Sequence, residues 1–204
     1  KDLDFETYLI ISSDKLGIYL YDIKNKNNLY FKEVNYENNF ETLNIEALSF
    51  FLEDNIFKIE KLAGQFIKNI YLIIENKKIL NLNISFKKKN YNKTITYNYL
   101  KEILVEAKDL FKENYQDQTI LHMLLVKYFV DDKYYSFFFE ELQGKDIRLE
   151  VKFISIPQNI SNILSKVLQK YQIKIVRFLD QNYIENYFED DLSELPEMIY
   201  RIKS

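Results

Sequence analysis

Two short apolar runs restrict the folds open to this chain more than any other feature: IKNIYLIIE at residues 67–75 and IKIVRFL at 173–179. Each run follows a segment in which apolar residues recur at steps of three and four, the pattern of an amphipathic helix. A strand that is apolar on both faces is typical of a parallel sheet, because helical connections cover both faces of such a sheet. The pattern therefore predicts an α/β fold with buried parallel strands.

Three segments are expected to be helices. The first is expected at 44–63, where Asn44 can cap the start and Gly64 can end the helix in the left-handed conformation. The second is expected at 97–113 and the third at about 158–171. In all three the apolar side chains fall on a single face, so each helix is expected to pack against a core through that face.

Short strands account for most of the remaining chain. Three strands separated by polar links predict an antiparallel meander near 7–12, 16–23 and 28–34. Later strands are expected at 78–87, 118–130, 133–142 and 146–156. The tail, 181–203, is expected to form one or two short helices with an acidic face.

This order of elements divides the chain into two parts. A β-β-β-α-β block is resumed later by β-α-β, which is the layout of a ribonuclease-H-like sheet. A β-α-β-β block lies between these halves. The sequence therefore predicts an α/β fold with a mixed sheet in a discontinuous core, residues 1–77 and 150–204, and a small α/β subdomain inserted at 78–149.

Composition argues against several classes of function. The formal net charge of −3 does not favour a nucleic-acid-binding surface, so we expect no nucleic-acid partner. The chain has no cysteine and one histidine, His122, which excludes cysteine-based and multi-histidine metal sites. No apolar run reaches the roughly 18–20 residues that span a bilayer, and we expect no secretion leader. A cytoplasmic location fits these features.

A ribonuclease-H-like sheet raises the alternative of a nuclease. Two-metal nucleases hold their ions about 4 Å apart with carboxylates. The strands at 8–11, 69–74 and 173–179 carry no carboxylate in their interiors, and Glu75 and Asp180 stand only at strand ends. The chain also lacks the Gly-x-Ser-x-Gly elbow of serine hydrolases. We therefore expect no catalytic residues, no metal ion and no enzymatic activity.

Four segments resemble, in their order and spacing, the bacterial actin-like cell-division protein FtsA. They are NIEALSFFLEDNIFKIEKLAGQFIKNIYLII (44–74), ITYNYLKEILVEAKDL (95–110), TILHMLLVKYFVDD (119–132) and LQGKDIRLEVKFISIPQNISNILSKVLQKYQIKIVRFL (142–179). The resemblance covers about residues 8–180 and corresponds to the amino-terminal half of a full family member. It implies an actin-like core, with residues 78–149 as the inserted subdomain of that family.

The resemblance also implies a nucleotide-binding hairpin, from which this chain departs. The family carries an Asp, a glycine and a small hydroxyl residue in its first hairpin; the Asp acts through the metal and the glycine lets phosphate approach. Aligned through Lys15, Ile10 stands at the Asp and Ser12 at the glycine. The family's second phosphate loop is Gly-rich, but no glycine follows Gly144. We expect a degenerate loop, with Ser12, Ser13, Asp14 and Lys15 where the nucleotide would bind, and no cofactor.

The aromatic run in KYYSFFFEEL, residues 133–142, is the candidate for a docking surface. In a strand, alternate side chains lie on opposite faces, so one set of these aromatics is expected in the core and the other on the surface. Exposed aromatic patches often mark binding sites for partners. The expected partner-binding residues are Tyr134, Tyr135, Phe137 and Phe138. Pairing along a free strand edge is a further route for partners.

The resemblance implies a non-enzymatic protein-interaction component of the cell-division machinery, similar to FtsA and, given the altered hairpin, with a degenerate nucleotide site. Its expected partners are other division proteins at the septum, and self-association is left open. Its expected location is cytoplasmic, at the inner face of the membrane at the division site if a terminal membrane helix has been trimmed. Two alternatives stand beside this hypothesis: an ATP-binding fragment of an actin-like protein, and an actin-like adaptor of pilus assembly.

Overall fold

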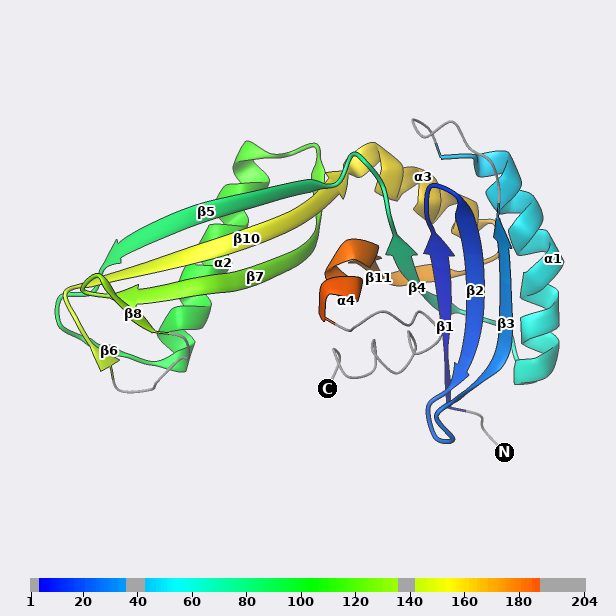
Figure 1. The fold of residues 1–204 in the computed structure, drawn as a ribbon, viewed down its shortest axis with the longest axis horizontal. Helices are drawn as coiled ribbons and strands as arrows, with labels where there is room; N and C mark the ends of the chain where they lie inside the picture. The colour runs from blue at the N-terminus through cyan, green and yellow to red at the C-terminus, as the bar shows by residue number, and fades with distance from the viewer. Residues whose placement is uncertain (1–3, 36–42, 136–141, 188–204) are drawn as a thin grey trace. The chain divides into compact units, whose positions relative to one another are not determined.

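The computed structural model describes residues 4–35, 43–135 and 142–187. Two compact units make up the chain: the first comprises residues 1–78 and 159–204, and the second comprises residues 79–158 (Figure 1). Among the helices of these described segments, none is both long enough and apolar enough to cross a membrane.

The first unit contains a five-stranded mixed sheet with the strand order β11-β4-β1-β2-β3. The meander expected at the start of the chain is present as β1 (Phe5–Ile11), β2 (Lys15–Asp22) and β3 (Asn27–Asn35), paired antiparallel. The two apolar runs form β4 (Asn69–Ile74) and β11 (Lys174–Asp180), and β4 runs parallel to both β1 and β11. The carboxyl ends of these three parallel strands therefore lie at one edge of the sheet.

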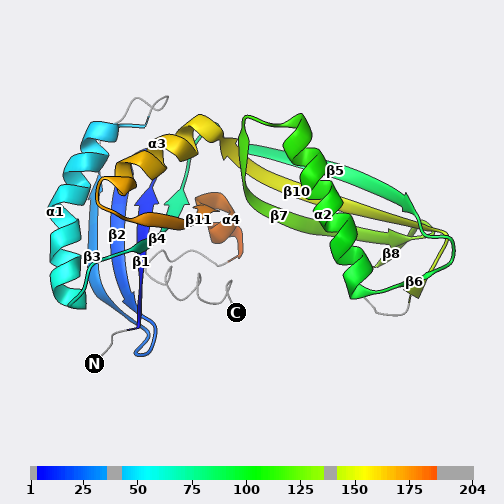
Figure 2. The same cartoon turned by 180° about the vertical axis from the view of Figure 1, so that it is seen from behind.

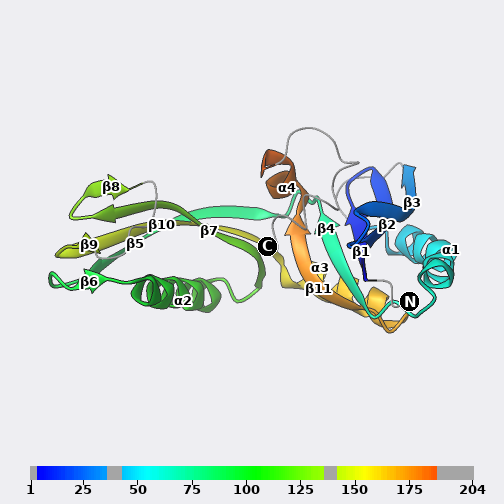
Figure 3. The same ribbon diagram turned by 90° about the horizontal axis from the view of Figure 1, so that it is seen from below.

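Two helices cover one face of this sheet. They are α1 (Ile45–Ala63) and α3 (Gln158–Gln169), while α4 (Gln181–Tyr187) lies over the opposite face (Figures 2 and 3). The expected caps of α1 are both present: the Asn44 side chain accepts a hydrogen bond from the Ala47 N–H at 2.9 Å, and Gly64 has a φ of 70°. Local sequence therefore sets the limits of α1, and its buried face sets the packing.

The second unit contains a four-stranded antiparallel sheet with the order β5-β10-β7-β8. Its strands are β5 (Leu80–Lys89), β7 (Gln118–Val130), β8 (Lys133–Tyr135) and β10 (Asp146–Pro157), and a separate pair is formed by β6 (Thr94–Ile95) and β9 (Leu142–Gln143). Helix α2 (Tyr97–Asn114) packs along one face of the sheet, where the Phe111 and Phe153 rings stack with centroids 4.5 Å apart. The described residues place no helix on the other face (Figure 3).

The expected fold class is confirmed: the chain is a mixed α/β protein with a ribonuclease-H-like sheet and an inserted α/β unit. The expected boundary between residues 149 and 150 nevertheless falls inside β10. That strand pairs with β5 and β7 up to its last residues, so it lies wholly within the second unit, which extends to Gln158. The strand expected at 133–142 is described only at its ends, as β8 and β9.

Candidate functional site

The turn between β1 and β2 corresponds to the expected degenerate phosphate loop. Ser12 is buried, Ser13 is half-buried and Asp14 is exposed. The Ser12 N–H donates to the Lys15 carbonyl oxygen at 2.9 Å, and the Ser12 hydroxyl donates to Asp14 Oδ1 at 3.0 Å. The Ser12 amide and hydroxyl, which could otherwise point at a phosphate, thus close the turn on itself.

The one cation of this turn is matched by an acid within the sheet. Lys15 Nζ lies 3.2 Å from Glu33 Oε1 on β3, with both side chains mostly buried. The same Glu33 oxygen accepts a hydrogen bond from the Tyr19 hydroxyl at 2.7 Å. Burial and this hydrogen bond raise the pKa of Tyr19, so the phenol stays protonated. Lys15 therefore forms a structural ion pair with Glu33.

Ile10, which stands where the actin-like family carries its metal-linked Asp, belongs to an apolar cluster. It is 1% exposed and packs in a group that also contains Ile73 of β4, Leu179 of β11 and Ile184 of α4. The group is completed by Tyr8, Tyr19 and Tyr21. A side chain without oxygen atoms cannot hold a hydrated metal ion, and the cluster leaves Ile10 almost no contact with solvent.

The two acidic residues at the strand ends take part in local structure, Glu75 through its backbone and Asp180 through its carboxylate. The Glu75 N–H donates to the Ile11 carbonyl oxygen at 2.9 Å, which joins the ends of β4 and β1. Asp180 is 2% exposed, and its Oδ2 accepts the Tyr183 N–H at 3.0 Å at the start of α4. Among the described residues, no three His, Cys, Asp or Glu side chains are grouped so that they could hold a metal ion.

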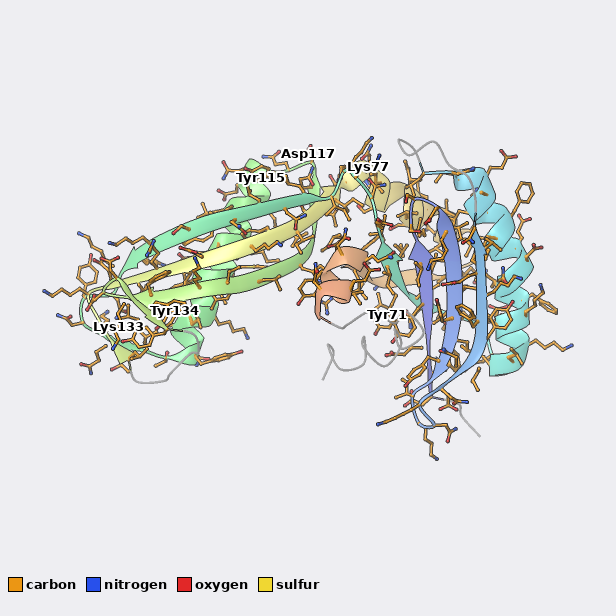
Figure 4. The ribbon with its side chains drawn as sticks, in the orientation of Figure 1. Tyr71, Lys77, Tyr115, Asp117, Lys133 and Tyr134 are labelled. Carbon is orange, nitrogen blue, oxygen red and sulfur yellow. The ribbon has the colours of Figure 1, made fainter. Side chains whose placement is uncertain are left out.

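The two tyrosines of the expected docking surface lie on opposite faces of the second unit. Tyr135 is half-buried on the α2 side, where its ring lies 5.9 Å from the ring of Tyr128. Tyr134 is 54% exposed on the uncovered face, with its ring 5.7 Å from that of Phe129 (Figure 4). Phe137 and Phe138 lie outside the described residues.

The uncovered face carries a row of side chains that sequence reasoning did not identify. Next to Tyr134, the guanidinium of Arg148 lies 4.0 Å from the centre of the Phe129 ring, a cation–π arrangement. Glu150 follows along β10 and pairs with Arg148 at 3.8 Å and with Lys127 at 3.4 Å. Arg148 and Phe129 are 19 residues apart in the chain and lie in separate strands. Only the cross-strand register, which the sequence does not give, brings them together. An aromatic and a planar cation side by side are common at protein interfaces.

Comparison with known proteins adds a fold relationship. No protein-family model matches the sequence, and no curated protein matches it. Among solved structures, the "PilM-PilN type IV pilus biogenesis complex" matches with a TM-score of 0.58 and 13% identity over 89% of this chain. The match covers 49% of the solved chain, so this chain spans about half the length of its structural relative. The chain has an actin-like fold.

Two further solved structures are more distant. One is the cytoplasmic domain of EpsL, an inner membrane component of the type II secretion system of Vibrio cholerae, with a TM-score of 0.41, 11% identity and coverage of 87% of this chain and 56% of the other. The second, from Bacteroides thetaiotaomicron, is a protein with an actin-like ATPase fold and unknown function, with a TM-score of 0.37, 16% identity and coverage of 91% and 56%. The comparisons do not single out the FtsA family.

Proposed function

We propose that this chain is an actin-like adaptor that binds other proteins of a pilus-assembly machine and does not hydrolyse a nucleotide. The observation that carries the proposal is the uncovered sheet face of the second unit, where Tyr134, Phe129 and Arg148 form an accessible aromatic and cationic row. A surface of this composition is suited to bury an aromatic or acidic segment of a partner.

The first hairpin supports the non-enzymatic part of the proposal. A nucleotide-dependent actin-like protein needs a carboxylate that acts through the metal and a loop that phosphate can approach. In this chain Ile10 is packed among apolar side chains, and Lys15 is paired with Glu33. Both features favour a scaffold over an ATPase.

The pilus setting is favoured over cell division by the fold comparison, in which the match with a TM-score above 0.5 is a pilus biogenesis complex. That complex joins an actin-like protein to a second protein, which is the type of partnership proposed here. An FtsA-like role at the division site is the alternative, and it rests on the four sequence segments alone. In either setting we propose a cytoplasmic location at the inner face of the membrane.

The two settings are distinguished by deleting the gene in its source organism. A pilus adaptor predicts loss of surface pili and of twitching movement with normal septation, whereas a division role predicts filamentous cells with normal pili. Complementation with Tyr134→Glu should fail to restore the lost function, although the variant folds, while Lys101→Glu on the solvent side of α2 should restore it. Normal pili in the deletion strain would refute the proposed setting, and full activity of Tyr134→Glu would refute the assigned surface.

A further inference from the structure

Strand β5 forms one edge of the sheet in the second unit and pairs only with β10. The ladder between them runs through ten consecutive residue pairs, from Leu80 opposite Ser155 to Lys89 opposite Asp146, with no shift of register. On the other side of β5, the described residues supply no strand. Half of its backbone N–H and C=O groups therefore point outward, in the spacing that a further strand would need.

The other sheet edges of the described residues are less suited to accept a strand. β11 has an irregularity at Val176 in its pairing with β4, and the β2–β3 ladder has a register shift between Leu20 and Tyr21. Of β8 the structure describes Lys133–Tyr135. Bulges are devices that discourage pairing with another chain. β5 has no bulge over its ten residues, so it is a long and regular edge in the described part of the chain.

The side chains of β5 alternate strictly between two environments. Leu82, Ile84 and Phe86 face α2 and are only half-buried, because one flank of the core cluster ends at this edge. The residues on the other face are exposed: Asn81, Asn83, Ser85, Lys87 and Lys89. A strand placed beside β5 with the same alternation would cover the open flank of the apolar row and face the polar row with its other side chains.

The charge of this edge is positive and only partly compensated. Lys88 bonds Glu106 of α2 at 2.5 Å, and Lys87 lies 3.7 Å from Asp146. Lys89 forms no ion pair with the described residues. β5 itself contains no acidic residue, so β5 of a second copy would place its lysines beside these lysines, and Glu106 and Asp146 are already paired within each copy. An acidic strand is the occupant that this edge complements.

We propose that an extended acidic segment of a partner protein pairs with β5 as an additional strand of this sheet. The segment alternates apolar side chains, which extend the row of Leu82, Ile84 and Phe86, with glutamate or aspartate side chains, which face Lys87 and Lys89. Main-chain hydrogen bonds supply the affinity and the alternation supplies the specificity. This inference rests on the proposed function as a protein-binding adaptor, and it assigns the chemistry of one partner.

The test uses the 204-residue chain and a synthetic probe. The probe is a fluorescein-labelled, end-capped ten-residue peptide that alternates valine with glutamate, and its control is a peptide of the same composition in scrambled order. Fluorescence anisotropy should show saturable binding of the alternating peptide that weakens with added salt. Hydrogen exchange with the peptide bound should slow at residues 80–89 and not at the other sheet edges.

Two charge-reversal variants localise the binding. Lys87→Glu combined with Lys89→Glu should weaken the alternating peptide by roughly fivefold to tenfold, since two exposed charge contacts are reversed. Lys101→Glu, on the exposed side of α2, is the matched control and should bind as the wild type does. Thermal unfolding of each variant shows that the fold is retained.

Three outcomes would overturn the inference. These are no saturable binding up to about 1 mM peptide, equal binding of the double variant, or a concentration-dependent dimer of the chain that Ile84→Lys dissociates, which would make a second copy the occupant. The proposed function fails separately, through normal pili in the deletion strain. If the peptide test fails while Tyr134→Glu still abolishes pili, the edge assignment is wrong and the adaptor function stands.

Discussion

The ammonium group of Lys15 lies 3.2 Å from Glu33 Oε1, and the hydroxyl of Tyr19 donates to the same oxygen at 2.7 Å. Glu33 is opposite Gly17 in the ladder between β2 and β3. A Cβ atom at Gly17 would stand 3.3 Å from Glu33 Cγ, tighter than most contacts, so the missing side chain leaves space for the carboxylate. Lys15 and Tyr19 thus both contact Glu33, on the same face of the sheet as Ile10.

The first prediction concerns Glu33. Glu33→Ala should lower the free energy of unfolding by about 1–3 kcal/mol, because the buried Tyr19 hydroxyl loses its acceptor and Lys15 loses its pair. Glu33→Gln keeps an acceptor and should lose about 1 kcal/mol or less. Urea unfolding measures both, with Glu102→Ala on exposed α2 as the control. Equal losses for the alanine and glutamine variants would show that the hydrogen bond contributes nothing.

The second prediction concerns the position that a metal-linked Asp would occupy. Ile10→Asp should destabilise the first unit by roughly 3–5 kcal/mol at neutral pH, because it places a carboxylate among buried apolar side chains without a partner. Ile10→Val removes one methylene group and should cost about 0.5–1.5 kcal/mol. Urea unfolding followed by circular dichroism makes the comparison. An Asp variant as stable as the Val variant would mean that water reaches this position.

Sequence periodicity was sufficient to predict the sheet of the first unit and the limits of α1, because these depend on local signals such as Asn44 and Gly64. Sequence periodicity did not predict burial and hydrogen-bond partners that depend on tertiary contacts. Asn55 is 2% exposed in α1 and is satisfied by the Tyr30 hydroxyl at 2.6 Å, a partner 25 residues away. Leu110 belongs to the apolar side chains of α2 and is nevertheless 47% exposed, because the apolar stripe of α2 is wider than the surface it covers.

The candidate site was predictable to a similar extent. The altered hairpin is visible in the residue types at Ile10 and Ser12, but the Lys15–Glu33 pair depends on β2–β3 register. The alternation of side chains along a strand correctly places Tyr134 and Tyr135 on opposite faces of the sheet. It does not say which of the two faces α2, since that depends on which face the helix covers. Lys87, Lys88 and Lys89 form a dense basic run in the sequence, and their position on an edge strand follows only from the sheet order.

The third prediction is that the chain does not bind ATP with Mg²⁺ in the micromolar range. The Ser12 amide and hydroxyl are used within the turn, Lys15 is paired, and the position of the metal-linked carboxylate is apolar. Titration of the chain with fluorescently labelled ATP and Mg²⁺ should give a linear, unsaturable response, unchanged in Lys15→Ala. Saturable micromolar binding that Lys15→Ala abolishes would reject the degenerate-site hypothesis.

The fourth prediction concerns alkaline pH. Burial, with a smaller contribution from Tyr135, raises the pKa of Tyr128 to about 12. Because the folded-state pKa is above the unfolded value of 10.0, the neutral phenol's contribution is fully present below pH 10 and is lost as the pH rises through about 12. The melting temperature should therefore fall over this interval, and Tyr128→Phe should fall less steeply. Parallel curves for the two proteins would contradict the assignment to Tyr128.

The fifth prediction separates the two tyrosines of β8. Tyr134→Ser should change the free energy of unfolding by about 0.5 kcal/mol or less, because this ring is mostly exposed and contacts chiefly Phe129. Tyr135→Ser should cost about 1–3 kcal/mol, since Tyr135 packs against the core cluster beside Tyr128. Urea unfolding gives both values.

If the surface serves partners, Tyr134→Ser abolishes pilus formation without unfolding the chain, whereas Tyr135→Ser acts only through stability and is rescued at low temperature. The reverse pattern would move the docking surface to the α2 side of the sheet.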